Sequence, residues 1–265
     1  MSLAGEEILD VDSSGSNGRS RAPAVARAAT VLRLLARERG GLGVTEIARR
    51  VGLVPSTCFH ILRALVEEGF ITFDLEKKTY RTGVGLLTLV RDAMASSDYP
   101  KVVQPALDTL SSQHKVTAVA VELDSRDRMV VVALSRSDSI ISLHVNVGSR
   151  FPSLISATGR CVAVASGLSR EELSARFDEL RWERRPRFED WYADVERVRE
   201  DGFALDRGNY IRGITVIAML IPPGPDRATR GIAAIGFEHH MTEKSLANLR
   251  DGLMAAVRDT AAQLR

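Results

Sequence analysis

Residues 44–70 constrain the fold of this chain most strongly, because they pack two short helical patterns around a tight break. Thr45 is placed to cap the first helix, which the apolar spacing predicts over 46–51, and Gly52 supplies the turn. Pro55 fits the first position of the second helix, where its missing N–H breaks no hydrogen bond. The pattern therefore predicts either a pair of packed core helices or a helix-turn-helix whose second helix enters a DNA groove.

The second predicted helix runs to about Glu68 and has two different faces. Four apolar residues at i, i+3, i+4 and i+7 are expected to pack on the neighbouring helices: Cys58, Ile61, Leu62 and Leu65. The opposite face has the same spacing but is turned away from that core: Ser56, Phe59, His60 and Arg63. Serine and arginine bind bases or phosphates and phenylalanine covers a thymine methyl group, so we interpret this face as a major-groove contact surface. The alternative is an ordinary exposed helix face. Thr57 lies at the start of the same helix, where its hydroxyl or N–H is placed to hold a phosphate, and the alternative role for this residue is helix capping.

The positive charge of the chain is concentrated around this segment. Residues 19–83 carry twelve Arg or Lys against six acids, giving +6, whereas 1–18 carry four acids and no base and the whole chain is only +2. A basic segment beside a neutral one is typical of a phosphate-binding module joined to another domain, although a solvated charged surface looks similar. Within the segment, Arg49 and Arg50 either reach the DNA backbone or are only solvated. Lys77 and Lys78 lie near the tip of a predicted hairpin, where they either follow the DNA or serve solubility.

The residues before and after these two helices predict a further helix and a hairpin, and together they form a winged helix-turn-helix domain over 22–83. An apolar stripe predicts a preceding helix that starts at Pro23 and packs on them: Val25, Ala28, Val31, Leu32 and Leu35. Two short strand patterns after Gly69 predict the hairpin, or wing. Residues 1–21 are rich in Ser, Gly and Asn and are expected to be a disordered tail. An apolar linker helix over 84–98 leads out of the domain and is expected to pack on another chain or on the second domain.

The remaining chain, 99–265, has a different pattern that predicts an α+β domain with an antiparallel sheet. Short β-branched runs and amphipathic stretches give the expected elements in this order: strands 116–123, 129–135 and 140–147, helices 156–166 and 188–202, strands 213–221 and 231–237, and a final helix from Thr242. A length of 265 residues agrees better with two domains than with one.

The sequence disfavours several classes of protein and site. No apolar run approaches the roughly 20 residues of a membrane helix, and the acidic start does not resemble a signal peptide, so we expect a cytoplasmic protein without a membrane partner. The two cysteines, Cys58 and Cys161, lack disulfide or metal-ligand spacing. His239 and His240 are expected at a strand end, on opposite faces, where they do not bind a metal together. Neither a metal nor another cofactor is expected.

An enzyme built on the α+β domain is the main alternative function. It requires a nucleophile with a base, or carboxylates around a pocket, and no G-x-S-x-G, P-loop or G-x-G-x-x-G motif after a strand occurs. Cys161 stands beside Arg160, but its apolar flanks indicate burial rather than activation. A second alternative is a sensor module that uses its winged helix only for protein contacts, which the +6 segment disfavours.

Several short strings, in their order and spacing from about residue 24 to about residue 264, resemble the IclR family of bacterial transcriptional regulators. They are TEIARRVGL, ST, ILRALVEEGF and YRTG in the first domain, and VGSRFP, SATGR, RVREDGFALD, GITVIA and MTEKSLANL in the second. The resemblance implies a winged helix-turn-helix joined by a helix to a GAF-like effector-binding domain. It also implies homodimers or homotetramers that bind double-stranded operator DNA, often of genes for breakdown of aromatic or small organic acids, and are switched by a small-molecule effector. Pro55 and His60 stand where the family commonly has basic residues, so the operator is expected to differ from those of typical relatives.

The resemblance also points to an effector pocket in the second domain. One part is the start of a helix, whose backbone N–H groups are placed to receive a carboxylate; it comprises Leu154, Ile155, Ser156, Ala157, Thr158 and Gly159. The alternative is an ordinary helix cap. Four other pocket positions follow from the alignment with the family alone: Asp206, Val216, Ala234 and Gly236.

This chain departs from the family in that pocket. Val216, Ala234 and Gly236 stand where the family commonly has Cys or Ser. Asn209 and Tyr210 stand where it commonly has Glu and Asn. The pocket is therefore expected to have fewer polar groups than usual and to favour a bulkier or more apolar ligand over a small dianion.

Overall fold

The structure of the protein, a computed structural model, describes residues 22–136 and 145–264. The chain divides into two compact units between Ser97 and Asp98. We call 22–97 the N-terminal unit and 98–264 the C-terminal unit. The predicted disordered tail, 1–21, and most of the predicted strand 140–147 lie outside the described residues.

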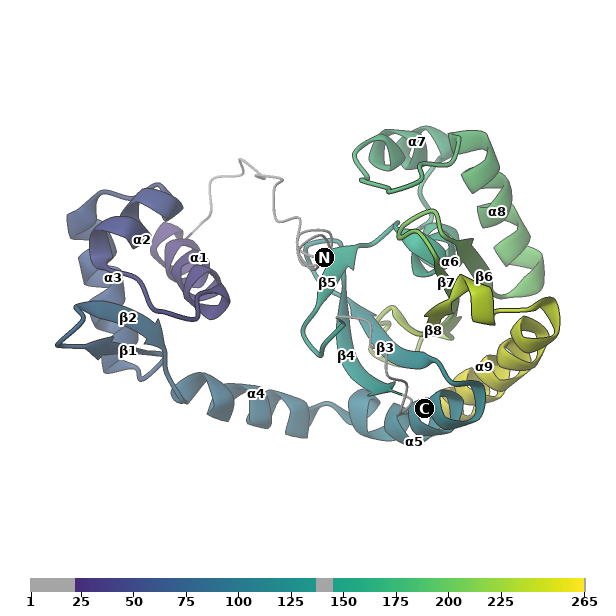
Figure 1. The fold of residues 1–265 in the computed structure, drawn as a ribbon, viewed down its shortest axis with the longest axis horizontal. Helices are drawn as coiled ribbons and strands as arrows, with labels where there is room; N and C mark the ends of the chain where they lie inside the picture. The colour runs from purple at the N-terminus through teal and green to yellow at the C-terminus, as the bar shows by residue number, and fades with distance from the viewer. Residues whose placement is uncertain (1–21, 137–144, 265) are drawn as a thin grey trace. The chain divides into compact units, whose positions relative to one another are not determined.

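The N-terminal unit folds as a helix-turn-helix closed by a hairpin (Figure 1). Its elements, in chain order, are α1 Pro23–Arg37, α2 Val44–Val51, α3 Pro55–Glu67, β1 Ile71–Asp74, β2 Thr79–Thr82 and α4 Gly85–Ser96. Gly52 ends α2 in the left-handed conformation, with φ 67°, and Pro55 opens α3, as the sequence predicts. Side chains from α1, α2, α3 and the hairpin share one apolar core, which includes the fully buried Val31, Ile47 and Leu62.

Two details of the N-terminal unit correct the sequence predictions. Thr45 does not cap α2, because the helix begins earlier and the carbonyl of Gly43 accepts the N–H of Ile47. Gly43 holds the extended capping position, and no side chain caps the helix. Val25 is 68% exposed rather than part of the core stripe, since it lies on the first turn of α1 and the packed part of that helix begins near Ala28.

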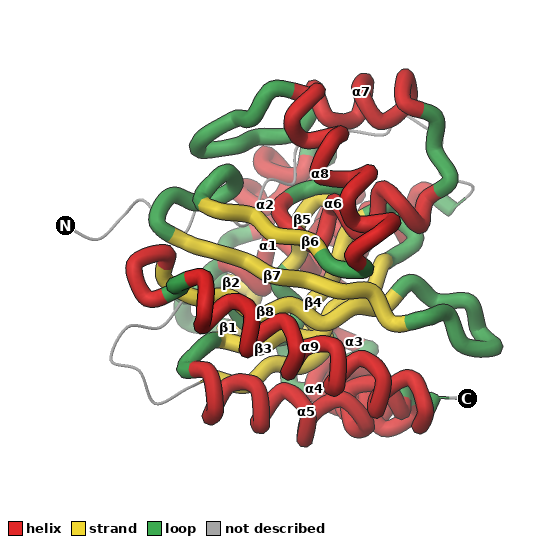
Figure 2. Tube along the Cα trace, turned by 90° about the vertical axis from the view of Figure 1, so that its right-hand side faces the viewer, coloured by secondary structure: helices red, strands yellow, loops and turns green. Residues whose placement is uncertain are grey.

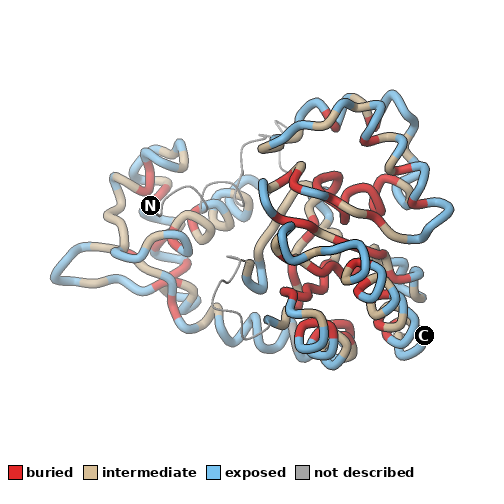
Figure 3. The backbone as a smooth tube through the Cα atoms, turned by 45° about the vertical axis from the view of Figure 1, so that its right-hand side comes forward, coloured by how far each residue is buried: buried red, intermediate tan, exposed pale blue. Residues whose placement is uncertain are grey.

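Helix α4 follows the hairpin and is exposed along most of its length (Figure 3). Leu87 is 70% exposed, and Leu89 and Val90 are 52% and 53% exposed. Contiguous exposed apolar surface of this kind is typical of an element that a partner covers. The expected packing of this helix on another chain stays a prediction.

The described part of the C-terminal unit is built on a six-stranded antiparallel sheet with the strand order β5-β4-β3-β8-β7-β6 (Figure 2). The strands are β3 Thr117–Leu123, β4 Arg128–Arg136, β5 Arg150–Pro152, β6 Ala204–Arg207, β7 Ile214–Ile221 and β8 Arg230–Phe237. An antiparallel sheet with separate helices confirms the predicted α+β class.

Helices cover both faces of this sheet (Figure 2). They are α5 Asp98–His114, α6 Ser156–Ser166, α7 Arg170–Asp178, α8 Phe188–Asp201 and α9 Glu243–Gln263. One core lies between the sheet and α5 with α9, and includes Ala118 and Ala120 of β3. The other lies between the sheet and α6 with α7 and α8, and includes Val119 and Val121. Because successive residues of a strand point to opposite faces, β3 contributes to both cores.

An aromatic cluster joins α7 to α8 at the outer side of the second core. The ring of Phe177 lies 5.6 Å from that of Trp182 and 5.3 Å from that of Trp191, measured between centroids. Phe188 packs on both Phe177 and Trp191. Since α8 in turn packs on α6, this cluster supports the helix that forms one wall of the cavity described below.

Helices α5 and α7 and strands β5 and β6 are not among the elements predicted from the sequence. Helix α5 contains Pro105, and a proline inside a helical pattern normally indicates the end of a helix. Helix α7 is short and mostly charged, with only Leu173 and Phe177 buried, so it has no long apolar stripe. Strands β5 and β6 have three and four residues, and their sequences RFP and ALDR lack the β-branched residues that are present in β1 and β2.

The predicted arrangement of His239 and His240 is wrong, because β8 ends at Phe237 and these residues form a short 3-10 helix, Glu238–His240. Their ring centroids lie 4.0 Å apart instead of on opposite faces of a strand. Among the described residues, no group of three or more His, Cys, Asp or Glu is arranged to hold a metal ion. Within 22–136 and 145–264, no helix combines the length and apolar character needed to cross a membrane.

Candidate DNA-binding and ligand-binding sites

Helix α3 separates a buried face from an exposed face. Cys58 and Leu62 are fully buried and Leu65 is nearly so, and this side packs on α1 and α2. The other face is exposed over the four predicted DNA-contact residues: Ser56, Phe59, His60 and Arg63. Phe59 is 48% exposed and its ring centroid lies 6.1 Å from that of His60, so the two side chains form one exposed aromatic pair. Arg63 is held by Glu67, with its Nε 2.9 Å from the carboxylate.

The start of α3 has the geometry of an anion site. Val54 occupies the capping position without a side-chain hydrogen bond, and Pro55 has no N–H to donate. The helical hydrogen bonds begin with the N–H of Cys58, which donates to the carbonyl of Val54 at 3.0 Å. The N–H groups of Ser56 and Thr57 therefore have no acceptor within the helix, and together with the helix dipole they favour a phosphate.

The predicted basic contacts of α2 are engaged with acids in the free protein. Arg49 donates to Glu46 through Nε at 2.9 Å and Nη2 at 2.6 Å, and Arg50 donates to Glu46 and to Glu38, each at 2.6 Å. These hydrogen bonds, from Arg49 first and Arg50 second, lower the pKa of Glu46 to about 2. Exposed ion pairs contribute little to stability, so a DNA phosphate can replace Glu46 as the partner of Arg49. Arg50 also ties α2 to the end of α1 and is less free to exchange.

The tip of the hairpin is ordered by Asp74, which accepts the N–H groups of Glu76 and Lys77, each at 3.0 Å. The hydrogen bond from Lys77 is the main cause of a lowered pKa of Asp74. Lys78 has a left-handed backbone, with φ 52°, and both lysine side chains are exposed. The tip therefore presents two cations on a defined turn, as a contact to the DNA backbone requires.

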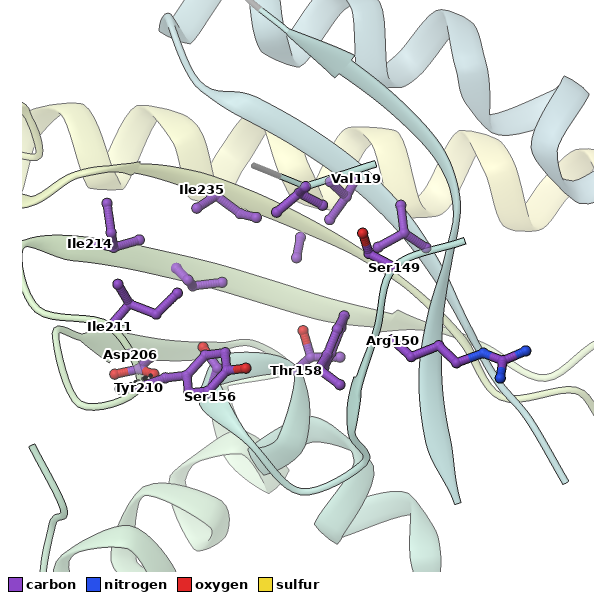
Figure 4. Close-up of a pocket in the computed structure, with 15 residues that line it drawn as sticks. Val119, Ser149, Arg150, Ser156, Thr158, Asp206, Tyr210, Ile211, Ile214 and Ile235 are labelled. Carbon is purple, nitrogen blue, oxygen red and sulfur yellow. Dashed lines mark hydrogen bonds between the residues drawn. The ribbon is translucent and has the colours of Figure 1, made fainter. Parts of the chain in front are cut away.

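A mostly apolar cavity lies in the C-terminal unit between the sheet, α6 and the loop after β6 (Figure 4). The empty space in and at the mouth of this cavity amounts to about 770 Å³, a volume that includes open solvent. Its apolar walls are Val119, Val131, Val145, Phe151, Ile211, Ile214, Val216, Ala233 and Ile235. Its polar residues are Ser149, Arg150, Ser156, Thr158, Asp206 and Tyr210. Apolar walls with a few polar groups are typical of a small-molecule site.

Three of the six polar lining residues lie together at one end of this cavity. Ser156, Asp206 and Tyr210 lie together there, whereas the guanidinium of Arg150 points away from the other lining residues (Figure 4). Asp206 is 1% exposed and accepts the N–H groups of Asn209 at 2.8 Å and of Tyr210 at 3.2 Å. Burial raises the pKa of Tyr210 to about 12, so its phenol stays protonated at neutral pH. We call this region, formed by Ser156, Asp206 and Tyr210, the polar end.

Ser156 opens α6 in a conformation that few residues other than glycine adopt. Its φ is 59°, it is 5% exposed, and its Oγ has no hydrogen-bond partner. Ile155 holds the capping position and makes no side-chain hydrogen bond, so the N–H groups of the first turn have no acceptor within the helix. Strained backbone and unsatisfied buried polar groups concentrate at ligand sites, which makes this helix start the best candidate for holding a ligand head group.

The structure brings four of the predicted effector residues to the cavity, namely Ser156, Thr158, Asp206 and Val216. Leu154, Ile155 and Ala157 are buried near the helix start but do not line the cavity. Gly159 packs so closely on the preceding chain that an added Cβ would lie 1.9 Å from the carbonyl carbon of Leu154. These neighbours therefore shape the helix start without facing the cavity.

The prediction for β8 is wrong about which face of the strand lines the cavity. Ala234 is fully buried in the core beneath α5 and α9, and a Cβ added to Gly236 would lie 2.1 Å from the Met241 side chain. Ala233 and Ile235 line the cavity instead. Because successive strand residues face opposite sides, an alignment error of one residue exchanges the two faces.

Strands β3, β4 and β5 contribute cavity walls that are not predicted from the sequence, including Val119, Val131 and Phe151. The alternation of these strands was visible in the sequence. Alternation does not show, however, which face of a sheet covered on both sides holds a cavity. Tyr210 was recognised only as a departure from the family and not as a lining residue.

Cys161 lacks the properties of a nucleophile. It is 3% exposed, and its Sγ donates to the carbonyl of Ala218 at 3.4 Å. Burial raises the pKa of its thiol to about 12. The thiol is therefore neutral at physiological pH, in agreement with its apolar flanks.

Two family models match the chain: the IclR helix-turn-helix domain over residues 24–75, and the C-terminal domain of the bacterial transcriptional regulator IclR over residues 92–264. The HTH-type transcriptional regulator Rv1719 of Mycobacterium tuberculosis is 30% identical over 202 residues, which cover 74% of this chain and 76% of that protein. The crystal structure of an IclR regulator from Alicyclobacillus acidocaldarius has a TM-score of 0.80 at 24% identity and covers 93% of this chain and 100% of that one. An IclR homologue from Microbacterium hydrocarbonoxydans, complexed with 4-hydroxybenzoate, has a TM-score of 0.72 at 19% identity, with 90% and 99% of the two chains covered.

Proposed function

Because this chain belongs to the IclR family of bacterial transcriptional regulators, we propose that it binds operator DNA and that a small-molecule effector changes this binding. The observation that supports the proposal is the pairing of a two-faced α3 with a separate, ligand-sized cavity. DNA contacts need an exposed basic surface, whereas a sensor needs an enclosed apolar one, and the described chain has both. An enzyme receives no comparable support, since the family consists of regulators and the Cys161 thiol is neutral. A role on operator DNA places the protein in the cytoplasm.

In the proposed complex, α3 enters the major groove and the hairpin tip follows the DNA backbone. The exposed aromatic pair of α3 and Arg63 contact base edges, and the N–H groups at the start of α3 hold a phosphate. The lysines of the hairpin position the protein without reading sequence. The full set of proposed contacts is Thr45, Arg49, Arg50, Ser56, Thr57, Phe59, His60, Arg63, Lys77 and Lys78.

The proposed assembly is a homodimer or a homotetramer made of two such dimers. Leu87, Leu89 and Val90 of α4 are exposed within a single chain, and a second copy is the partner that we expect to cover them. A two-fold dimer presents two copies of α3 to the DNA. The operator is therefore expected to be palindromic or nearly so, with half-sites spaced by about one helical turn or a multiple of it.

The proposed effector is an organic or aromatic acid with an apolar body and one polar head group. The apolar walls favour the body, and the N–H groups at the start of α6 favour an anionic head. A small dianion fits poorly, because the Asp206 carboxylate already lies at the polar end and the Arg150 guanidinium points away from it. The regulated genes are then expected to serve the breakdown of such an acid.

Selection of DNA fragments by the purified protein, followed by gel-shift titration, tests the DNA-binding part of this proposal. We expect an enriched palindromic sequence. His60→Ala and Arg63→Ala should each lose about 1–3 kcal/mol of discrimination between this sequence and a one-base variant, whereas Lys77→Ala should weaken both DNAs similarly. A selection without any enriched sequence would contradict sequence-specific binding.

A thermal-shift screen of aromatic acids, keto acids and hydroxy acids tests the effector part. A compound that binds only the folded protein raises its unfolding midpoint, and the same compound should then change the affinity for the selected operator. Val216→Phe, which fills the cavity, should remove the stabilisation and retain DNA binding. A compound that stabilises the protein in the cavity without any change in operator affinity would contradict the proposed switch.

A further inference from the structure

Arg160 is a buried cation close behind the polar end of the cavity. It lies one turn into α6, is 1% exposed and does not line the cavity. A buried guanidinium is unfavourable unless it is ion-paired and hydrogen-bonded. Its Nε lies 3.1 Å from Asp194 of α8, its Nη1 donates to the carbonyl of Ser156 at 3.0 Å, and its Nη2 donates to Oδ1 of Asn209 at 3.4 Å. Arg160 therefore connects three separate segments of the C-terminal unit.

Two of these partners belong to, or adjoin, the polar end. Ser156 lines the cavity with a strained backbone and an unpartnered hydroxyl, and Arg160 holds the carbonyl of this same residue. Asn209 immediately precedes Tyr210, and its N–H donates to Asp206. Arg160 thus positions both sides of the polar end, namely the first turn of α6 and the turn that carries Tyr210.

The third partner leaves part of the positive charge of Arg160 uncompensated. The Asp194 side chain is 29% exposed, and its carboxylate also pairs with Arg197, which is 68% exposed. This carboxylate is therefore shared between two guanidinium groups and screened by solvent. Around Arg160 itself the protein is buried and the dielectric constant is low, so its field acts strongly on the nearby helix start. There it opposes the repulsion that an anionic head group would feel from Asp206.

We propose that Arg160 is the positioning residue that sets the charge preference of the cavity, so that a monocarboxylate binds in preference to a neutral ligand of the same shape. The inference rests on the proposed effector site and adds to it a residue that does not touch the ligand. Two contributions are combined in this role: the side chain fixes the geometry of the polar end, and its charge offsets that of Asp206. The two contributions can be separated by substitution, because lysine keeps the charge and glutamine keeps only a hydrogen-bond donor.

Matched pairs of acid and amide test this role in the full-length protein. Titration calorimetry with 4-hydroxybenzoate and 4-hydroxybenzamide, and with benzoate and benzamide, compares ligands whose head groups differ in charge but little in shape. We expect the wild type to bind the acid at least about tenfold more tightly than the amide. Arg160→Gln should weaken acid binding about tenfold and change amide binding by less than about threefold. Arg160→Lys should weaken both ligands but keep the preference for the acid, because an ammonium lacks the fork of donors.

Two further variants change the surroundings of Arg160 instead of Arg160 itself. Asp194→Asn keeps an acceptor but removes the counter-charge, so acid binding should tighten several-fold while amide binding stays the same. Arg197→Gln should act in the opposite direction, because it leaves the Asp194 carboxylate to Arg160 alone: acid binding should weaken by less than about threefold, since Arg197 lies at the surface, and amide binding should stay the same. The positive charge of Arg128 also acts on Tyr210. Because Arg128 is the same in every variant, it does not account for differences in ligand affinity between the variants.

Equal losses of acid and amide binding in Arg160→Gln would show that Arg160 only supports the fold, and would overturn the proposal. The same holds if the wild type binds the amide as tightly as the acid, or binds neither member of either pair. If Arg160→Gln does not fold, Asp194→Asn decides alone, since a purely structural role predicts no tighter acid binding. Operator gel shifts test the proposed function separately. Absence of operator binding together with an intact acid preference would contradict that function and still support this role of Arg160.

Discussion

Helices α3 and α6 begin alike but lie in opposite environments. Neither has a side-chain cap, and each leaves N–H groups of its first turn without an acceptor in the helix. The start of α3 lies beside an exposed face, whereas eight of the eleven residues of α6, Ser156–Ala163, are buried. A helix start without a side-chain cap thus suits two kinds of anion. One is a DNA phosphate, which exchanges its counterions for the protein at an exposed surface, and the other is a ligand head group that is fully removed from water.

The difference in environment determines what each helix tolerates. Exposed side chains around α3 can move or exchange partners at little cost, so substitutions there should change DNA affinity and leave the free energy of unfolding nearly unchanged. The start of α6 depends on close packing, so substitutions there should change stability and ligand binding together.

Gly159→Ala is expected to have the largest effect. The added Cβ would lie 1.9 Å from the carbonyl carbon of Leu154, and only movement of the backbone relieves that contact. We expect the free energy of unfolding to fall by roughly 3 kcal/mol or more, measured by denaturant titration, with loss of stabilisation by ligand. Gly167→Ala is the matched control, because Gly167 has φ 66° but no neighbour within 4 Å, so only backbone strain of about 1–2 kcal/mol is expected. Equal losses in the two variants would contradict close packing at the start of α6.

The double substitution of Lys77→Ala with Lys78→Ala is expected to have an intermediate effect, on DNA alone. Binding should weaken roughly tenfold at moderate salt, and the slope of log affinity against log salt should fall by about 0.9 for each lysine that neutralises a phosphate. The free energy of unfolding should change by less than about 0.5 kcal/mol, because both side chains are exposed. Fluorescence anisotropy over a salt series measures the slope, and an unchanged slope would remove the hairpin tip from the interface.

Glu46→Gln is expected to have the smallest effect and the opposite sign. Removing this carboxylate frees Arg49 from its bidentate partner, so DNA affinity should rise about twofold to threefold at low salt. Glu200→Gln is the control, since it makes the same change of net charge on an exposed position of α8 in the other unit. An equal rise in both variants would show that net charge, and not release of Arg49, is the cause.

The pH dependence of this rise follows from the low pKa of Glu46. A carboxylate with a folded pKa of about 2, against a usual value of 4.5, stabilises the fold fully above about pH 4.5 and loses this contribution as the pH falls towards 2. Glu46 therefore remains charged, and competes for Arg49, throughout the range in which DNA is bound. The gain in affinity of Glu46→Gln should be the same at about pH 5.5 and about pH 8, and a gain confined to one of them would contradict this assignment.

Sequence patterns predicted α3 and its two faces because one side of this helix is buried and the other is exposed. Hydrophobic spacing then indicates burial, and of the four residues that it selects, Cys58, Leu62 and Leu65 are buried and Ile61 is half-buried. Helix α6 is buried nearly all round, so its spacing contains no information on which side meets a cavity. Only the resemblance to a family points to Ser156, and nothing in the sequence separates it from its neighbours Leu154 and Ile155.

The remaining features of the ligand site depend on contacts between distant parts of the chain. Ala233 and Ala234 are identical residues on a strand covered on both faces, so their sequence does not show which of them lines the cavity. The partners of Arg160 lie 34 and 49 residues further along the chain, at Asp194 and Asn209. A charged residue in an apolar helix indicates that a partner exists, but tertiary structure alone identifies it.

Both tryptophans of the chain belong to the aromatic cluster of α7 and α8, and the N-terminal unit contains none. Tryptophan emission from the unmodified protein therefore originates entirely in the unit that holds the cavity. A dye on the operator DNA reports on the other unit at a separate wavelength. When the complex of protein and operator DNA is mixed rapidly with ligand and both signals are recorded, the delay between ligand binding in the cavity and the change in DNA binding is measured. This delay gives the order in which the two events occur.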